Sequence, residues 1–283
     1  MRKSQVLEHV CSKPGAFLLS GVVVCFSCIA PSSVRAHEVF HVKKLHVEKG
    51  HKEVEIQGAH FSGHPEEEEG HDDEHHHGIR HAHEAALLYG MTDWWQTGLA
   101  LGLEKPLEGK FDLASIEFEN IFVLLPEKSG FGFGLMANFG RSFEEHTNSI
   151  ELGTVSSLNF HNWDATLNSS FGRNLSGDET DWGYDYAAQV RFNLDDQWKF
   201  GIEAYGKIEN IKNAGSFDAQ THRMGPVLYW SSASEHEEEG HQGHDGEKEE
   251  HEEMHIHTEL GLLFGVSDEA NDVTIKWGMG VSF

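Results

Sequence analysis

The chain of 283 residues carries 47 acidic and 21 basic side chains, a formal net charge of −26 at pH 7. A chain this acidic repels nucleic acid and no basic patch offsets the repulsion, so nucleic acid is excluded as a partner. The length alone permits one or two domains. Beyond the N-terminal region there is no long apolar run. That excludes a helical membrane protein but not a β-barrel, because barrels cross the bilayer with short alternating strands.

Residues 1–36 predict a secretory signal peptide. Arg2 and Lys3 supply the positive start, residues 16–30 are mostly apolar, and Ala36 ends a stretch of the kind that signal peptidase reads. All three cysteines of the chain lie in this segment. Cleavage after Ala36 would therefore leave no thiol for a disulfide or a thiolate-bound metal. Residues 37–50 are short, mixed and slightly basic, and we expect a periplasmic or lumen-tucked lead-in there.

Apolar and polar side chains alternate from residue 51 to the C-terminus. Because successive side chains of a strand point to opposite faces, the pattern predicts strands with one apolar and one polar wall. The expected strands are Glu53–Phe61, His83–Met91, Trp95–Leu103, Asp112–Leu125, Phe131–Phe139, Ile150–Phe160, Trp163–Phe171, Trp182–Phe192, Trp198–Lys207, His222–Trp230, Ile256–Gly265 and Val273–Phe283. We therefore predict an all-β fold, an antiparallel transmembrane β-barrel of about 12 strands over residues 51–283.

The last strand carries the clearest signal. From Val273 to Phe283, apolar residues alternate without exception with small or polar ones, which gives one wall for lipid and one for a polar interior. Phe283 resembles the C-terminal aromatic signal that the outer-membrane barrel assembly machinery reads. The strand thus predicts the bacterial outer membrane as the location, with membrane lipid and the assembly machinery as partners.

Turns and aromatic residues also favour a barrel. Tight turns at Thr92-Asp93, His161-Asn162 and Asp195-Asp196 alternate with longer connections, and such alternation is typical of outer-membrane barrels. Aromatic residues gather beside the tight turns and predict an interfacial girdle. The girdle residues are Trp94, Trp95, Phe160, Trp163, Trp198, Tyr229 and Trp230.

Three short stretches resemble one known family. Residues 89–94 (Tyr-Gly-Met-Thr-Asp-Trp), 225–228 (Gly-Pro-Val-Leu) and 261–268 (Gly-Leu-Leu-Phe-Gly-Val-Ser-Asp) are similar to recurring pieces of outer-membrane barrels associated with meta-pathway phenol degradation. That family is labelled as transporters, and the resemblance extends from about Lys49 to Phe283. It implies the fold more than any substrate. Two histidine-rich insertions, at residues 63–84 and 231–257, depart from the family's pattern.

The two insertions combine imidazole with carboxylate groups and hold no thiol, a set that suits Zn²⁺, Ni²⁺ or Cu²⁺. The candidate metal ligands are His64, His71, His75, His76, His77, His81, His83, His236, His241, His244, His251, His255 and His257. Because the spacing of a structural zinc site is missing, we expect several weak, exchanging sites and no obligatory cofactor. The alternative is that both insertions are solvated, low-complexity loops whose charges only keep them out of the membrane.

Two histidine pairs lie where strands are expected to begin. His81 and His83, like His255 and His257, stand at positions i and i+2, so each pair can present two imidazoles on one face of a strand. If Phe283 ends at the periplasm, counting the strands back places the second insertion at the periplasmic mouth and the first at the extracellular mouth. The residues expected to support the pairs by hydrogen bonds are Glu84 and Glu259.

The inward wall is predicted to carry both signs of charge. Its pore-lining candidates are Glu55, Glu84, Glu117, Glu119, Asp185, Arg191, Lys199, Glu203, Lys207, Arg223, Glu259 and Lys276. A mixed-sign interior fits either a salt-bridged plug or a narrow water-filled path. The excess of acids favours cations over anions as the solute.

These features predict an outer-membrane channel or transporter for a small solute, with divalent metal cations captured by the histidine-rich loops. Two alternatives stay open. One is a non-conducting barrel that displays metal-binding loops, and the other is a channel for organic or aromatic compounds, as the family resemblance implies. An enzyme is not expected, because His146, His161 and His222 have no Ser or Asp companions at a recognisable spacing.

Overall fold

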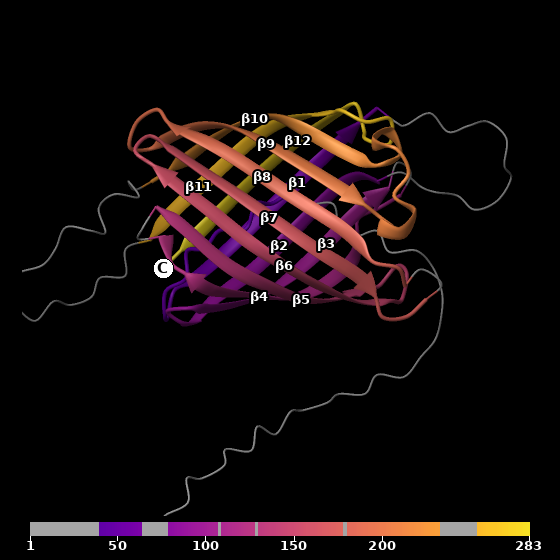
Figure 1. The fold of residues 1–283 in the computed structure, drawn as a ribbon, viewed down its shortest axis with the longest axis horizontal. Coiled ribbons are helices and arrows are strands. Elements are labelled where there is room, and N and C mark those ends of the chain that lie inside the picture. The colour runs from indigo at the N-terminus through magenta and orange to yellow at the C-terminus, as the bar shows by residue number, and fades with distance from the viewer. Residues whose placement is uncertain (1–39, 64–78, 107–108, 128–129, 178–179, 233–253) are drawn as a thin grey trace, which may run out of the picture.

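The computed structural model describes residues 40–63, 79–106, 109–127, 130–177, 180–232 and 254–283. This part of the chain forms antiparallel strands that close into one barrel, because β1 pairs with β12 as well as with β2 (Figure 1). The strands are β1 (Lys52–Ser62), β2 (Ile79–Thr92), β3 (Trp95–Pro106), β4 (Asp112–Leu125), β5 (Phe131–Ser142), β6 (Asn148–Phe160), β7 (Trp163–Asn174), β8 (Gly183–Asn193), β9 (Trp198–Ile208), β10 (Thr221–Ser231), β11 (His255–Gly265) and β12 (Val273–Ser282). Two 3-10 turns, η2 (Ile211–Asn213) and η3 (Phe217–Ala219), lie between β9 and β10.

The predicted fold class and the twelve predicted strands are confirmed. The strand ends differ from the prediction by a few residues. The largest difference is at β2, which begins at Ile79 rather than at His83. Its first residues continue to pair with the end of β3 across a register shift between Ile79 and His81. No helix in the described ranges is long and apolar enough to cross a membrane.

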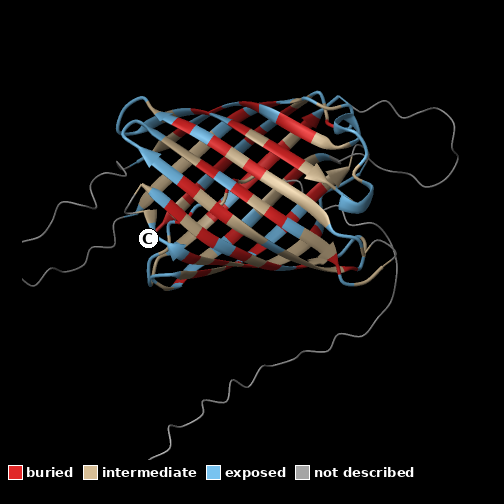
Figure 2. Cartoon of the chain, in the orientation of Figure 1, coloured by how far each residue is buried: buried red, intermediate tan, exposed pale blue. Residues whose placement is uncertain are grey.

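Strand β12 shows how the barrel divides into two walls. Thr274 and Lys276 are almost completely buried, whereas Ile275 and Trp277 are 43% and 38% exposed. Buried and exposed residues alternate in the same way along the other strands (Figure 2). A soluble protein does not leave large apolar side chains exposed over its whole circumference. The outer wall therefore faces lipid, and the polar wall encloses the lumen.

The two ends of the barrel differ in their connections. Strand β1 begins and strand β12 ends at the same end of the barrel, where the backbone N–H of Lys52 donates to the carbonyl of Phe283 at 3.0 Å. We call this the terminal end and the opposite one the far end. The tight turn at residues 161–162 lies at the terminal end, and the longer connection at residues 209–220 lies at the far end. This is the alternation of turn lengths predicted from the sequence.

Large aromatic side chains gather at the terminal end. Trp94, Phe160 and Trp163 lie beside tight turns and are 53%, 64% and 53% exposed, as an interfacial girdle requires. Tyr229 is wrongly assigned to this girdle. Because β10 turns its odd-numbered residues inward, Tyr229 is buried in the lumen, where its hydroxyl donates to Glu203 Oε1 at 2.7 Å.

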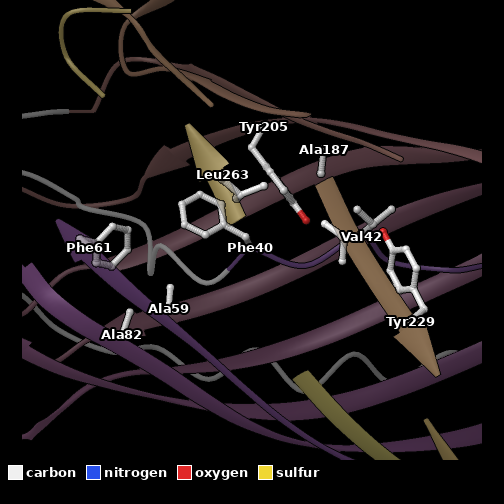
Figure 3. Packing of buried hydrophobic residues seen from close by; sticks show 10 residues of the cluster. Phe40, Val42, Ala59, Phe61, Ala82, Ala187, Tyr205, Tyr229 and Leu263 are labelled. Carbon is white, nitrogen blue, oxygen red and sulfur yellow. The ribbon is translucent and has the colours of Figure 1, made fainter. Parts of the chain in front are cut away.

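Residues 40–47, which we call the lumen segment, run inside the barrel before β1 begins. Phe40 is buried against Phe61 and Tyr205, with ring centroids 5.9 and 5.0 Å apart (Figure 3). Leu45 is buried against an apolar patch of the inner wall. The patch consists of Ile121, Val123, Met136 and Val155. These contacts place the lumen segment inside the barrel, which is the lumen-tucked one of the two placements expected for this lead-in. The predicted signal peptide lies outside the described residues.

The outer wall can be tested with a charge placed at two depths of β3. Leu101 lies near the middle of this strand and is 39% exposed, whereas Thr97 lies on the same face close to the terminal end. Leu101→Arg is expected to lower the free energy of unfolding by about 2–4 kcal/mol and Thr97→Arg by about 0–1 kcal/mol, because the cost of an arginine on the lipid face falls toward the interface. Reversible urea unfolding in phospholipid vesicles measures both. Equal costs would contradict the assignment of this face to lipid.

Candidate functional site

Two cavities in the lumen are lined by residues that the structure describes. The larger cavity has a volume of about 200 Å³, and the smaller, near the terminal end, about 40 Å³. The predicted pore-lining residues at the larger cavity are Glu84, Glu117, Glu119, Asp185, Lys207 and Arg223. Those at the smaller cavity are Arg191, Lys199 and Glu259. The others, Glu55, Glu203 and Lys276, are buried inside the barrel. All twelve side chains lie on the inner wall.

The larger cavity is lined by more acidic than basic side chains. Its carboxylates belong to Glu84, Glu117, Glu119, Glu151 and Asp185, and its lysines and arginines are Lys43, Lys207 and Arg223. Glu151 was missing from the predicted wall. The alternation along β6 could have identified it. Leu152 is 46% exposed on the outer wall, so its neighbour Glu151 faces the lumen.

Lys43 fastens the lumen segment to the wall. Its Nζ lies 2.6 and 2.7 Å from the two carboxylate oxygens of Glu119 on β4. Asn168 on β7 binds the backbone of the same residue, because its Oδ1 accepts from the Lys43 N–H at 2.6 Å and its Nδ2 donates to the Lys43 carbonyl at 3.0 Å. The Asn168 amide thus pairs with a backbone that has no neighbouring strand. Sequence patterns on either strand could not indicate this contact, since it depends on where the segment enters.

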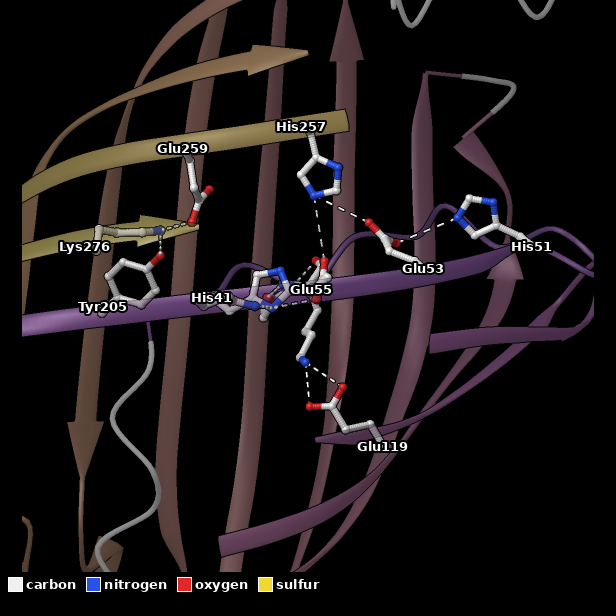
Figure 4. A network of polar contacts seen from close by, with 12 residues as sticks. His41, His51, Glu53, Glu55, Glu119, Tyr205, His257, Glu259 and Lys276 are labelled. Carbon is white, nitrogen blue, oxygen red and sulfur yellow. Dashed lines mark hydrogen bonds and ion pairs between the residues drawn. The ribbon is translucent and has the colours of Figure 1, made fainter. Parts of the chain in front are cut away.

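A buried network links four consecutive strands of the inner wall, β9 to β12, beside the segment. Lys276 Nζ lies 2.6 Å from Glu203 Oε2. It also lies 2.8 Å from Glu259 Oε1 (Figure 4). Tyr205 and Tyr229 donate to the two oxygens of Glu203 at 2.6 and 2.7 Å. Lys276 and Glu203 are 1% and 0% exposed. Such a pair is tolerated away from water because each remaining oxygen and proton finds a partner.

A second group of charges lies near the terminal end. Asp164 on β7 accepts from Arg191 Nε at 2.6 Å, and its other oxygen lies 3.5 Å from Lys199 Nζ. Asp164 was not predicted, although it faces the same side of its strand as the inward polar residues. Two cations thus share one carboxylate at this point of the lumen.

At the far end, the loops that follow β7 and β9 are joined by an exposed ion pair. Lys212 Nζ lies 2.7 Å from Asp181 Oδ1, and Asn210 donates to the other oxygen at 2.8 Å. These hydrogen bonds from Lys212 and Asn210 lower the pKa of Asp181. The pair tethers two loops at the rim of the barrel.

The first histidine pair lies on the outer wall of the barrel, near the far end, and not in the lumen. His81 and His83 share one face of β2, with ring centroids 6.4 Å apart, as their spacing predicts. That face is the outer wall, because His83 packs against the outward Trp277 at 5.8 Å. His60 on β1 joins them, with its Nδ1 3.3 Å from His81 Nδ1. Glu84 points the other way, into the larger cavity, so its predicted support for this pair is wrong.

The second pair lies on the inner wall at the terminal end. His255 and His257 stand on the same face of β11 as Glu259. The Glu259 carboxylate binds Lys276 instead of an imidazole. His257 reaches across to β1, where its Nε2 lies 3.5 Å from Glu53 Oε1 (Figure 4).

The other predicted metal ligands lie outside the described residues. They are His64, His71, His75, His76, His77, His236, His241, His244 and His251. The strands that flank the two insertions end at opposite ends of the barrel, the first at the far end and the second at the terminal end. Strand parity predicted this arrangement. Metal binding by the insertions stays a prediction.

No protein-family model matches the chain, and no curated protein matches it. Among solved structures, the fold is similar to that of an outer membrane channel from Pseudomonas putida F1, at 10% identity and a TM-score of 0.52, over 88% of this chain and 99% of that one. The KdgM porin in complex with disordered oligogalacturonate matches at 8% identity and a TM-score of 0.48, over 82% and 98%. The NanC porin matches at 14% and 0.47, over 81% and 98%.

Likeness at this level of identity concerns the fold. The chain is a closed antiparallel β-barrel, and its lipid-facing wall places it in the bacterial outer membrane, the location predicted from its sequence. The resemblance to barrels associated with phenol degradation stays a prediction.

The buried network makes a prediction about stability. Lys276→Met leaves Glu203 and Glu259 without their cation, and breaking a buried pair in this way is expected to cost about 3–5 kcal/mol of unfolding free energy. The double variant with Glu203→Gln should cost less than the sum of the two single variants, because they remove one shared interaction. Urea unfolding in vesicles measures all three. Strictly additive costs would contradict direct pairing.

Proposed function

We propose that the barrel is an outer-membrane channel for small solutes and that its lumen favours cations, divalent metal ions among them. The observation that carries this proposal is the charge around the larger cavity, five carboxylates against three lysine or arginine side chains. Fixed charges in a narrow lumen with low-dielectric walls act strongly on a passing ion. A net acidic lining attracts cations and repels anions.

The histidine-rich insertions support the choice of metal ions. Imidazole and carboxylate groups at both mouths would raise the local concentration of divalent metal. Metal ions that bind these sites only weakly would dissociate again and could then enter the lumen. The likeness to a channel from Pseudomonas putida F1 supports conduction by analogy of fold.

The lumen segment favours a second candidate, a non-conducting barrel that binds metal. Lys43 of this segment lines the larger cavity and Lys44 the smaller one. Phe40 and Leu45 hold the segment by apolar contacts. A solute would pass either beside the lumen segment or only after the segment has moved out of its way. We therefore assign the lumen segment the role of a plug that restricts conductance.

Charge selectivity tests the channel directly. In planar bilayers under a salt gradient, the reversal potential of the refolded protein should show that K⁺ permeates better than Cl⁻. Glu117→Gln together with Glu151→Gln removes two of the five carboxylates and should shift the permeability ratio toward one. The exposed loop variant Glu269→Gln changes the same kind of charge away from the lumen and should leave the ratio unchanged. Equal selectivity in all variants would contradict cation selection by the cavity.

The plug can be tested with two neighbouring lysines. Lys43→Met removes the contacts with Glu119 and should raise the mean conductance, because the segment is held less firmly. Lys44→Met removes a lysine charge at the smaller cavity but leaves the contact with Glu119 intact, so it should raise the conductance less than Lys43→Met does. No current from any variant would sink the channel and leave the metal-binding barrel. If the current is the same in all these variants and neutral aromatic solutes enter vesicles that contain the protein, the organic-solute alternative is favoured.

A further inference from the structure

We propose that Glu53, Glu55 and His257 form a binding site for one divalent first-row transition-metal ion inside the terminal end of the lumen. Each side chain offers one ligand atom, and these atoms lie within 4.8 Å of one another. The site does not need the barrel to conduct. Only its position on the path of an ion rests on the proposed function.

The three side chains converge from two strands that do not pair. Glu53 and Glu55 lie on β1, His257 lies on β11, and β12 runs between them. The His257 Nε2 lies 3.5 Å from Glu53 Oε1 and 4.0 Å from Glu55 Oε1 (Figure 4). Ligands about 2.0–2.2 Å from a tetrahedral zinc ion lie about 3.3–3.6 Å from one another. Small side-chain movements would therefore complete the site.

Gly280 on β12 allows the imidazole to cross. It pairs with His257 on one side and with Glu55 on the other. A Cβ built at Gly280 would overlap ring atoms of His257, so any larger residue would displace the ring. Because Gly280 has no side chain, the His257 ring can lie over the backbone of β12 and reach the carboxylates of β1.

Glu55 independently indicates that a cation belongs here. Its side chain is buried, with 8% of the residue exposed, and its Oε2 accepts no hydrogen bond from the described residues. A buried carboxylate is costly unless a charge or a hydrogen-bond donor compensates it. Glu53 adds a second carboxylate on the same face of β1. One bound dication would compensate both.

Two more histidines stand behind the carboxylates. His41 Nδ1 lies 3.8 Å from Glu55 Oε2, and His51 Nε2 lies 3.8 Å from Glu53 Oε2 (Figure 4). At 3.8 Å neither imidazole hydrogen-bonds its carboxylate directly, and His41 Nδ1 lies 2.8 Å from Gln57 Nε2 instead. Because His41 belongs to the lumen segment, an ion held by Glu55 would also sit beside the segment that restricts the lumen.

The ligand set indicates the class of metal. One imidazole and two carboxylates without a thiol suit Zn²⁺ and Co²⁺. Ca²⁺ takes about six to eight oxygen ligands and fits less well. Three protein ligands leave a position for water, so the ion is exchangeable and the site differs from a closed structural zinc site.

Titration of the full-length refolded protein with Co²⁺, followed by visible absorption, tests the site. His257→Gln and Glu55→Gln each remove a ligand, whereas Gly280→Val removes none and displaces the ring. His255→Gln removes an imidazole from the same face of β11 outside the cluster and is the matched control. The wild type and His255→Gln should show one tight site, and the other three variants should bind about tenfold more weakly or worse.

The predicted weak binding by the histidine-rich insertions would be common to all variants, so the tight site is measured at substoichiometric Co²⁺. Heat-modifiable gel mobility verifies folding, and if Gly280→Val does not fold, the two ligand variants decide. Identical affinities and spectra in the wild type, His257→Gln and Glu55→Gln would overturn the site.

Conductance of the same preparations separates the site from the proposed function. Variants that lose tight Co²⁺ binding but still pass K⁺ support both the metal site and the channel. A protein that binds Co²⁺ tightly at these residues but passes no current keeps the site and refutes the channel.

Discussion

In a lipid bilayer every backbone N–H and C=O group has to find its partner within the protein, and the pairing of β1 with β12 meets this requirement. The register joins the two strands along their length, from Glu53 opposite Ser282 to Ser62 opposite Val273. Without this seam, two edge strands would expose unpaired groups to hydrocarbon. Closure fixes which side of each strand faces lipid and which faces the lumen. The interior chemistry follows from that division.

Once the apolar residues face outward, the polar residues of all strands converge on a small interior. The charges in this interior have two different arrangements. Around Lys276 the charges neutralise one another, with Glu203 and Glu259 as acceptors and two tyrosines completing the network. Around the larger cavity an excess of carboxylates is left after the cations have been matched. The first arrangement compensates charges that are buried away from water, and the second supplies the electrostatic preference on which the proposed function rests.

Side-chain alternation was sufficient to predict the strands and the inner wall, because the period of two is a local property. The same rule would have placed His81 and His83 outside, since they share parity with Leu87 and Tyr89, which are 60% and 44% exposed. Their grouping with a histidine-rich insertion concealed this. Tyr229 was misplaced for a similar reason, since its neighbour Trp230 suggested a girdle while its own position on β10 faces the lumen.

Contacts between distant parts of the chain were beyond sequence reasoning. The lumen segment is positioned by Glu119 and Asn168, residues on strands far along the chain. The approach of His257 to Glu53 requires both barrel closure and a glycine on the strand between them. Neither requirement leaves a periodic signal, because each depends on which strands become neighbours.

The lumen segment also constrains the order in which this protein can assemble. It precedes β1, and β1 completes its pairing only with the last strand, so the closing contact has nearly the largest sequence separation that the chain allows. A barrel that closed with the segment outside would leave the patch around Ile121 facing a water-filled interior. Phe40, Val42 and Leu45 would then forgo burial worth about 1.5–3 kcal/mol for a large side chain. The β1–β12 pairing and the packing of the interior therefore reach full stability together. If the sheet closes around the lumen segment, the segment does not have to be threaded into a barrel that has already closed.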